Sequence, residues 1–124
     1  GRGNSGLYHV GMYENQILNS FGSDGIYNKA GDSLNQGPLA NAFFRPLTSQ
    51  TYDIEFTNAK SLNGKKIKNA RITSRLNGIV IHENFAIPRK TGGARSDPEG
   101  TPGSIKLQGH GNPLQFRNIW ILEK

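Results

Sequence analysis

The sequence has no cysteine, and this absence excludes a disulfide framework and a thiolate metal site. It also lacks an apolar run long enough for a transmembrane helix, and no signal peptide is recognisable. No window places apolar residues at the i, i+3, i+4 and i+7 positions of an amphipathic helix. What remains is a chain of 124 residues, enough for one domain with a single modest core.

Glycine, proline and asparagine punctuate the chain instead. The sequence holds 16 glycines and six prolines, and pairs such as Asn63-Gly64 and Asn77-Gly78 separate short apolar runs. Asn-Gly readily adopts the positive φ angles of a type I′ turn, so we expect a hairpin at each pair. Residues 51–56 alternate between apolar and polar side chains, as a strand with one solvated face does. The sequence therefore predicts an all-β domain with less than roughly a tenth of its residues in helices.

The expected strands are short, and long loops separate some of them. The strands cover residues 6–10, 12–18, 51–56, 70–76, 79–83, 104–108 and 115–122, with loops over 22–49 and 88–103. This arrangement fits a single jelly-roll β-sandwich over residues 1–124. We expect most of the core to come from Tyr52, Ile54, Phe56, Ile72, Leu76, Leu107, Phe116 and Trp120. The last strand is apolar on both faces, so Trp120→Ala should cost about 3–5 kcal/mol.

The net charge is +6, and many of the basic residues cluster between Lys60 and Arg75. A nucleic-acid surface interleaves such charges with exposed aromatics, and no aromatic residue lies inside this run. A solvated face explains the cluster better, so we expect no nucleic-acid partner. Attraction to an acidic polysaccharide or to a membrane surface stays open.

Two segments carry side chains suited to chemistry. His110 lies in a turn rich in Gly, Asn and Pro ahead of the last apolar strand, and such turns often present binding or catalytic groups. Glu14 and Gln16 alternate onto one strand face, with side chains about 6.5–7 Å apart. A carboxylate beside a carboxamide suits sugar hydroxyls, because one only accepts and the other also donates. The alternatives, a purely structural histidine and two side chains that simply face water, stay open.

Seven segments match one known family in the same order. They are Asn4–Tyr8, Tyr13–Leu18, Gly25–Tyr27, Gln50–Phe56, Ala70–Thr73 with Leu76–Gly78, Thr91–Arg95, and Gly109–Pro113 with Phe116–Trp120. Together they resemble the 3-keto-disaccharide hydrolase family over essentially the whole chain. The resemblance implies a concanavalin A-like, glucanase-like jelly roll, a carbohydrate substrate or ligand, and a place in the bacterial periplasm or outside the cell.

The resemblance also bears on the chemistry. An ordinary glycosidase needs two carboxyl groups beside the scissile bond. At the positions of the laminarinase-type Glu-x-Asp-x-x-Glu motif this chain has Glu14, Gln16 and Asn19. Two of the three acids are therefore amides, which excludes direct hydrolysis by that motif. The family implies another route, in which a sugar already oxidised to a ketone at C3 loses its C2 proton, expels the glycosidic oxygen and then adds water. That route needs a general base, an electrophile for the ketone oxygen and polar groups that hold the ring.

Particular residues are candidates for these roles. His110 is the candidate base, and Glu14 could orient it, act as the acid or join it in binding a cation. The substrate-binding candidates are Gln16, Asn112, Arg117, Asn4 and Tyr27. A divalent cation stays open, because His110, Glu14 and Asp24 would make only a weak, oxygen-rich set, and we assign no metal residue.

Two departures from the family pattern bear on function. The strands that usually precede Asn4 are absent, so the chain matches roughly the C-terminal two-thirds of the family domain and its sheets would expose unpaired edges. The segment before Gln50 lacks the usual Gly-Glu-Trp and carries Phe43-Phe44, a pair suited to contact with another subunit. We therefore expect self-association or a longer N-terminus. Two other functions stay open: a carbohydrate-binding jelly roll without turnover, and an assembly subunit completed by a partner's strands.

Overall fold

The computed structural model describes residues 4–20, 37–45, 47–111 and 113–124, and it contains strands and no helix within these ranges. The sequence prediction of an all-β domain is thus confirmed for the described residues. The eight strands are β1 (Asn4–His9), β2 (Tyr13–Leu18), β3 (Tyr52–Thr57), β4 (Lys60–Leu62), β5 (Lys65–Lys68), β6 (Ala70–Leu76), β7 (Ile79–Ile87) and β8 (Lys106–Leu107). In this part of the chain no helix is long and apolar enough to cross a membrane.

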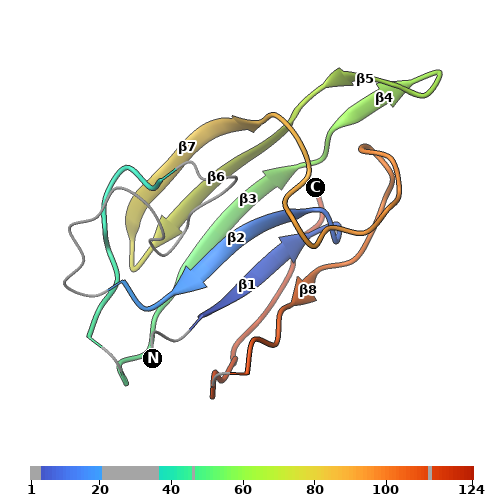
Figure 1. Ribbon diagram of the computed structural model, residues 1–124. Helices are drawn as coiled ribbons and strands as arrows, with labels where there is room; N and C mark the ends of the chain where they lie inside the picture. Colours follow the sequence, from blue (N-terminus) through green and yellow to red (C-terminus); the bar gives the residue numbers. More distant parts are fainter. Residues whose placement is uncertain (1–3, 21–36, 46, 112) are drawn as a thin grey trace.

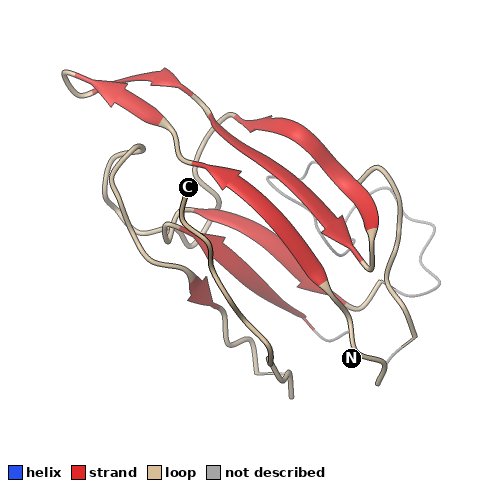
Figure 2. Ribbon diagram, turned by 180° about the vertical axis from the view of Figure 1, so that it is seen from behind, coloured by secondary structure: helices blue, strands red, loops and turns tan. Residues whose placement is uncertain are grey.

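Two antiparallel sheets of three strands form the sandwich. One has the order β2-β1-β8 and the other the order β3-β6-β7 (Figure 1). Seen from behind, the β2-β1-β8 sheet lies beyond the β3-β6-β7 sheet (Figure 2). Strands β4 and β5 pair only with each other and project from one end of the sandwich (Figure 1). This open, two-layered arrangement is consistent with the predicted jelly-roll sandwich.

The core lies between the two sheets. Its main cluster consists of the buried residues Met12, Tyr13, Ala59, Ala70, Ile72 and Ile87, with Ile54 and Phe56 partly buried against them. A second cluster consists of Ala42, Leu76 and Ile81, with Phe43 and Tyr52 packed on it. The strict alternation of β3 explains its part in both, because Tyr52, Ile54 and Phe56 face inward while the residues between them are exposed. Five of the eight predicted core residues are therefore placed as expected.

The two Asn-Gly turns form as predicted. Asn63 and Gly64 have φ angles of 51° and 75° between β4 and β5, and Asn77 and Gly78 have φ angles of 52° and 81° between β6 and β7. Positive φ at both central residues is the mark of a type I′ turn. The Asn77 side chain also bonds to the chain ahead of β3, because its Oδ1 accepts from Thr51 N at 2.9 Å. Local turn chemistry thus determines these two hairpins.

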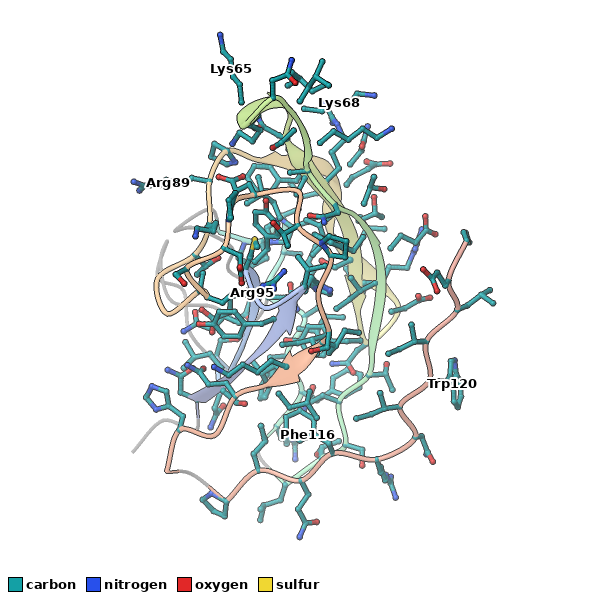
Figure 3. All side chains as sticks on the ribbon, turned by 90° about the vertical axis from the view of Figure 1, so that its right-hand side faces the viewer. Lys65, Lys68, Arg89, Arg95, Phe116 and Trp120 are labelled. Atoms are coloured by element: carbon teal, nitrogen blue, oxygen red, sulfur yellow. The ribbon has the colours of Figure 1, made fainter. Side chains whose placement is uncertain are left out.

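The C-terminal prediction is wrong. No strand forms over the described residues 113–124, and every one of them is exposed. Trp120 is 84% exposed and points away from the sheets (Figure 3), while Phe116 and Leu107 are 38% and 39% exposed. An apolar run becomes a buried strand only where a second strand pairs with it and another layer covers it. The sequence pattern of the run itself identifies neither the second strand nor the covering layer. Strand β8 is likewise shorter than the predicted 104–108, since it spans Lys106 and Leu107, with one further backbone bond from Gln108 N to Gly6 O at 2.8 Å.

Candidate functional site

Polar side chains gather on the outer face of the β2-β1-β8 sheet, the face turned away from the core. The β1–β2 hairpin pairs Tyr8 with Glu14 and Gly6 with Gln16, so these side chains share one face. Residues at alternate positions, His9 and Tyr13, face the core instead, where both rings contact Phe56 with centroids 4.7 and 5.7 Å apart. Alternation along two strands therefore separates a polar outer face from an apolar inner one.

Gly6 makes room for the Glu14 side chain. A Cβ atom at position 6 would collide with the carboxyl group of Glu14, with Glu14 Cδ only 2.9 Å away. The carboxyl group therefore lies against the backbone of β1 instead of standing away from the sheet. This close approach explains why Glu14 is partly buried although its strand lies at the edge of the sheet.

The loop after β7 borders this carboxyl group. Thr91 bonds to the start of β2 twice, since its N–H donates to Met12 O at 2.9 Å and its Oγ1 accepts from Glu14 N at 3.0 Å. The Tyr8 hydroxyl lies 3.0 Å from Gly92 O and 3.3 Å from Glu14 Oε2. The loop thus forms one wall beside Tyr8 and Glu14.

Burial and neighbouring groups shift the pKa values of Glu14 and Tyr8. Desolvation raises the pKa of Glu14, while the contact with Tyr8 and the positive charge of His110 act in the opposite direction. Desolvation, and then the charge and contact of Glu14, raise the pKa of Tyr8 to about 12. His110 itself is exposed, in the segment that follows β8. Although 96 positions separate Glu14 and His110 in the sequence (110 − 14), their charges interact across this face.

Two further groups complete the face. Gln16 Nε2 donates to Asn4 Oδ1 at 3.3 Å, so these two predicted sugar-binding residues lie together. Lys106 pairs with Tyr8 in the sheet, and its Nζ lies 5.5 Å from the centroid of the Tyr8 ring. A carboxyl group, carboxamides, a phenol and an ammonium group therefore lie on one sheet face, and the charge of His110 acts on the carboxyl group.

The other predicted residues are placed differently. Arg117 is exposed, and its Nη2 donates to Ser49 Oγ at 3.0 Å, beside the chain that leads into β3 and not beside Glu14. Asn112 and Tyr27, and Asp24 from the weak cation set, lie outside the described residues. Within the described ranges no group of three His, Cys, Asp or Glu side chains could hold a metal ion.

Sequence reasoning missed Tyr8, Thr91, Gly92 and Lys106. A signal existed for Tyr8, because a short turn centred on Gly11 fixes the hairpin register and so places Tyr8 opposite Glu14. No local signal exists for Thr91 and Gly92, whose place beside Glu14 depends on how a long loop folds back over the sheet.

Comparison with known proteins identifies a family and a related structure. The sequence profile of the 3-keto-alpha-glucoside-1,2-lyase-like domain matches residues 1–122. A crystal structure from Parabacteroides distasonis ATCC 8503, named a "putative glycosyl hydrolase", superposes with a TM-score of 0.77 at 29% sequence identity. The alignment covers 90% of this chain and 49% of that one, so this chain spans about half the length of that protein. Among curated proteins, none matches the chain. The chain belongs to the family of 3-keto-alpha-glucoside-1,2-lyase-like domains.

Proposed function

We propose that this protein cleaves 3-keto-glycosides by elimination followed by hydration. The observation that carries the proposal is the partly buried carboxyl group of Glu14, which shares the outer sheet face with Tyr8 and Gln16 and interacts with the charge of His110. The family and the structural neighbour support a glycoside hydrolase-like or lyase-like activity. Placement in the bacterial periplasm or outside the cell, which the resemblance implies, stays a prediction.

The ketone at C3 makes the proposed reaction accessible to side chains of this kind. His110, in its neutral form, removes the proton from C2, and the electron pair forms the C1–C2 double bond as the glycosidic oxygen leaves C1 and takes a proton from Glu14. Water then adds to C1 and gives a proton back to Glu14, and the proton held by His110 returns to C2. The sum is hydrolysis of the glycosidic bond, with no change in the oxidation state of the ketone. General acid–base catalysis of this type contributes about 10²–10⁴-fold to a rate.

The remaining polar groups would hold the sugar. Gln16 and Asn4 offer a linked pair of carboxamides, which donate to and accept from hydroxyl groups. Arg117, the sequence candidate for the electrophile, is engaged with Ser49. The proposal therefore rests on the sheet face itself.

The test uses an aryl 3-keto-α-glucoside, whose cleavage releases a coloured phenol. His110→Ala should lower the rate of release by about 10²–10⁴-fold, while calorimetry shows unchanged binding of methyl α-glucoside, because a base acts mainly in the transition state. Glu83→Gln removes an exposed carboxylate from β7, in the other sheet, and should leave both measurements unchanged.

Three other results would contradict the proposal. Equal loss of binding and of turnover in His110→Ala would make the imidazole a ligand or a fold element. Binding of the sugar without release by the unsubstituted protein would favour a carbohydrate-binding jelly roll. Neither binding nor release would favour an assembly subunit.

A further inference from the structure

The β4–β5 hairpin carries positive charge that its neighbours do not neutralise. Residues 60–68 include four lysines and no acidic residue. Lys66 is paired, because its Nζ lies 3.1 Å from Glu99 Oε2. Lys60, Lys65 and Lys68 are exposed and form no ion pair with any residue that the structure describes. Three ammonium groups without an acidic partner in the described ranges therefore lie close together on one hairpin.

The basic residues of the neighbouring strand β6 have partners instead. Arg75 lies opposite Asp53 of β3, so the register places opposite charges side by side. Arg71 donates from Nη1 to Asn84 O at 2.8 Å. The basic run noted in the sequence thus divides into arginines engaged on the β3-β6-β7 sheet and lysines that are free on the hairpin.

One face of the hairpin is held against the loop after β7. Ser61 Oγ donates to Glu99 O at 2.7 Å, and Lys66 Nζ donates to Pro88 O. Ser61 and Lys66 lie opposite each other in the register, so both belong to this anchored face. The loop therefore fixes the hairpin from one side and leaves the other side open.

The open side combines lysine with exposed apolar side chains. Leu62 lies opposite Lys65 in the register, on the face turned away from the loop. Ile67 lies where the register shifts, so it has no cross-strand partner. Leu62 and Ile67 are 61% and 62% exposed. Lys65 and Lys68 point away from the sandwich (Figure 3), so the hairpin presents charge and apolar surface together.

This combination matches the surface of an anionic lipid bilayer. Ammonium groups are attracted to the phosphates of the headgroups, and apolar side chains beside them leave water for the boundary of the acyl chains. An acidic polysaccharide would attract the same lysines, but it offers no apolar phase to Leu62 and Ile67. A hairpin that only had to stay solvated would carry polar residues at both positions. The two apolar side chains therefore favour a lipid surface.

We propose that the β4–β5 hairpin docks this protein onto anionic lipid headgroups, with its three free lysines on the phosphates and with Leu62 and Ile67 at the acyl boundary. The inference goes beyond the proposed reaction and does not rest on it. The hairpin pairs only with itself and projects from one end of the sandwich (Figure 1), whereas Glu14 lies on the outer face of the β2-β1-β8 sheet. Docking through the hairpin and binding of a sugar therefore use different surfaces.

The test is co-sedimentation of the protein with vesicles of phosphatidylglycerol and phosphatidylcholine in equal parts. We expect binding that weakens as salt is raised and that is lost on vesicles of phosphatidylcholine alone. The double variant Lys65→Ala/Lys68→Ala should bind about 30-fold more weakly, because each lysine near such a surface contributes about fivefold. Leu62→Ser/Ile67→Ser keeps every charge and should bind about tenfold more weakly. All four side chains are exposed, so the fold should persist, as circular dichroism would check.

Arg45→Ala/Arg117→Ala is the matched control. It removes two exposed positive charges as well, but near the start of β3, whereas the hairpin follows the end of that strand. Its binding should equal that of the unsubstituted protein, and an equal loss in both double variants would overturn the inference by showing that net charge alone drives binding. The inference also fails if Leu62→Ser/Ile67→Ser binds normally, if the protein binds alginate but not the vesicles, or if it binds neither. None of these measurements needs cleavage of a sugar, so the two proposals fail separately.

Discussion

The two faces of the β2-β1-β8 sheet place different demands on neighbouring residues. Tyr13 and His9 point inward, where their rings pack against Phe56 between the sheets. Tyr8 and Glu14 point outward, where burial raises the pKa of both groups and the charge of His110 opposes the shift at Glu14. A change on the inner face should therefore alter stability, and a change on the outer face should alter proton affinity and turnover. This division shows that alternation along a strand can separate folding from chemistry within a few residues.

The largest effect on stability should come from the core between the two sheets. Ile72 of β6 is 1% exposed in the main core cluster, so Ile72→Ala should reduce the free energy of unfolding by about 2–5 kcal/mol. Denaturant titration measures this loss. Ile79→Ala is the matched control, because Ile79 is 49% exposed on β7 and its loss should cost much less. Equal losses of unfolding free energy in the two variants would show that the sheets do not bury Ile72. The pKa of Glu14 should be the same in both variants, because neither substitution touches the outer face of the β2-β1-β8 sheet.

The next effect concerns a titratable residue on the inner face. Burial lowers the pKa of His9 from 6.5 to about 4, and its Nε2 has no hydrogen-bond partner among the described residues. Between these values the unfolded chain binds the proton and the folded chain does not, so stability falls as pH falls. The contribution of His9 is fully present above about pH 6.5, and about 3 kcal/mol is lost by about pH 4. Urea titrations across this range would measure the loss.

His9→Phe isolates that contribution. The variant keeps an aromatic ring against Phe56 but cannot be protonated, so the stability difference between the two proteins should grow as pH falls. A constant difference from pH 4 to pH 7 would mean that His9 is hydrated and does not titrate with a lowered pKa.

The smallest effect tests a region that belongs to neither face. Trp120 is 84% exposed in the C-terminal segment, so Trp120→Ala should change stability by only about 0.5 kcal/mol or less. The strand pattern alone predicted a cost of about 3–5 kcal/mol. Tryptophan fluorescence gives a second measurement, since Trp120 is the only tryptophan and its emission should be that of a hydrated indole. A blue-shifted emission together with a large loss of unfolding free energy would mean that Trp120 is buried in a strand, as the sequence pattern predicted.

The sequence predicted those features that depend on neighbours in the chain. The Asn77-Gly78 turn and the alternation of β3 determine their structure locally, and both were expected correctly. Glu14 and Gln16 share a face for the same reason, because the side-chain period of a strand is two. The prediction of a C-terminal strand over residues 115–122 was wrong because a strand must pair with, and be covered by, other segments of the chain. The Gly92 carbonyl was missed because a braced loop brings it to Tyr8 over a separation of 84 residues.

The exposed C-terminal segment also has a consequence in solution. Residues 119–122 are four consecutive apolar residues, and such extended stretches tend to pair edge to edge with another copy. Arg117 and Lys124 flank them, and the net charge of +6 makes two copies repel each other. Salt shortens the reach of that repulsion from about 10 Å at 0.1 M to about 3 Å at 1 M. The self-association expected from the sequence should therefore depend on ionic strength, with dilute buffer keeping copies apart and concentrated salt bringing these segments together.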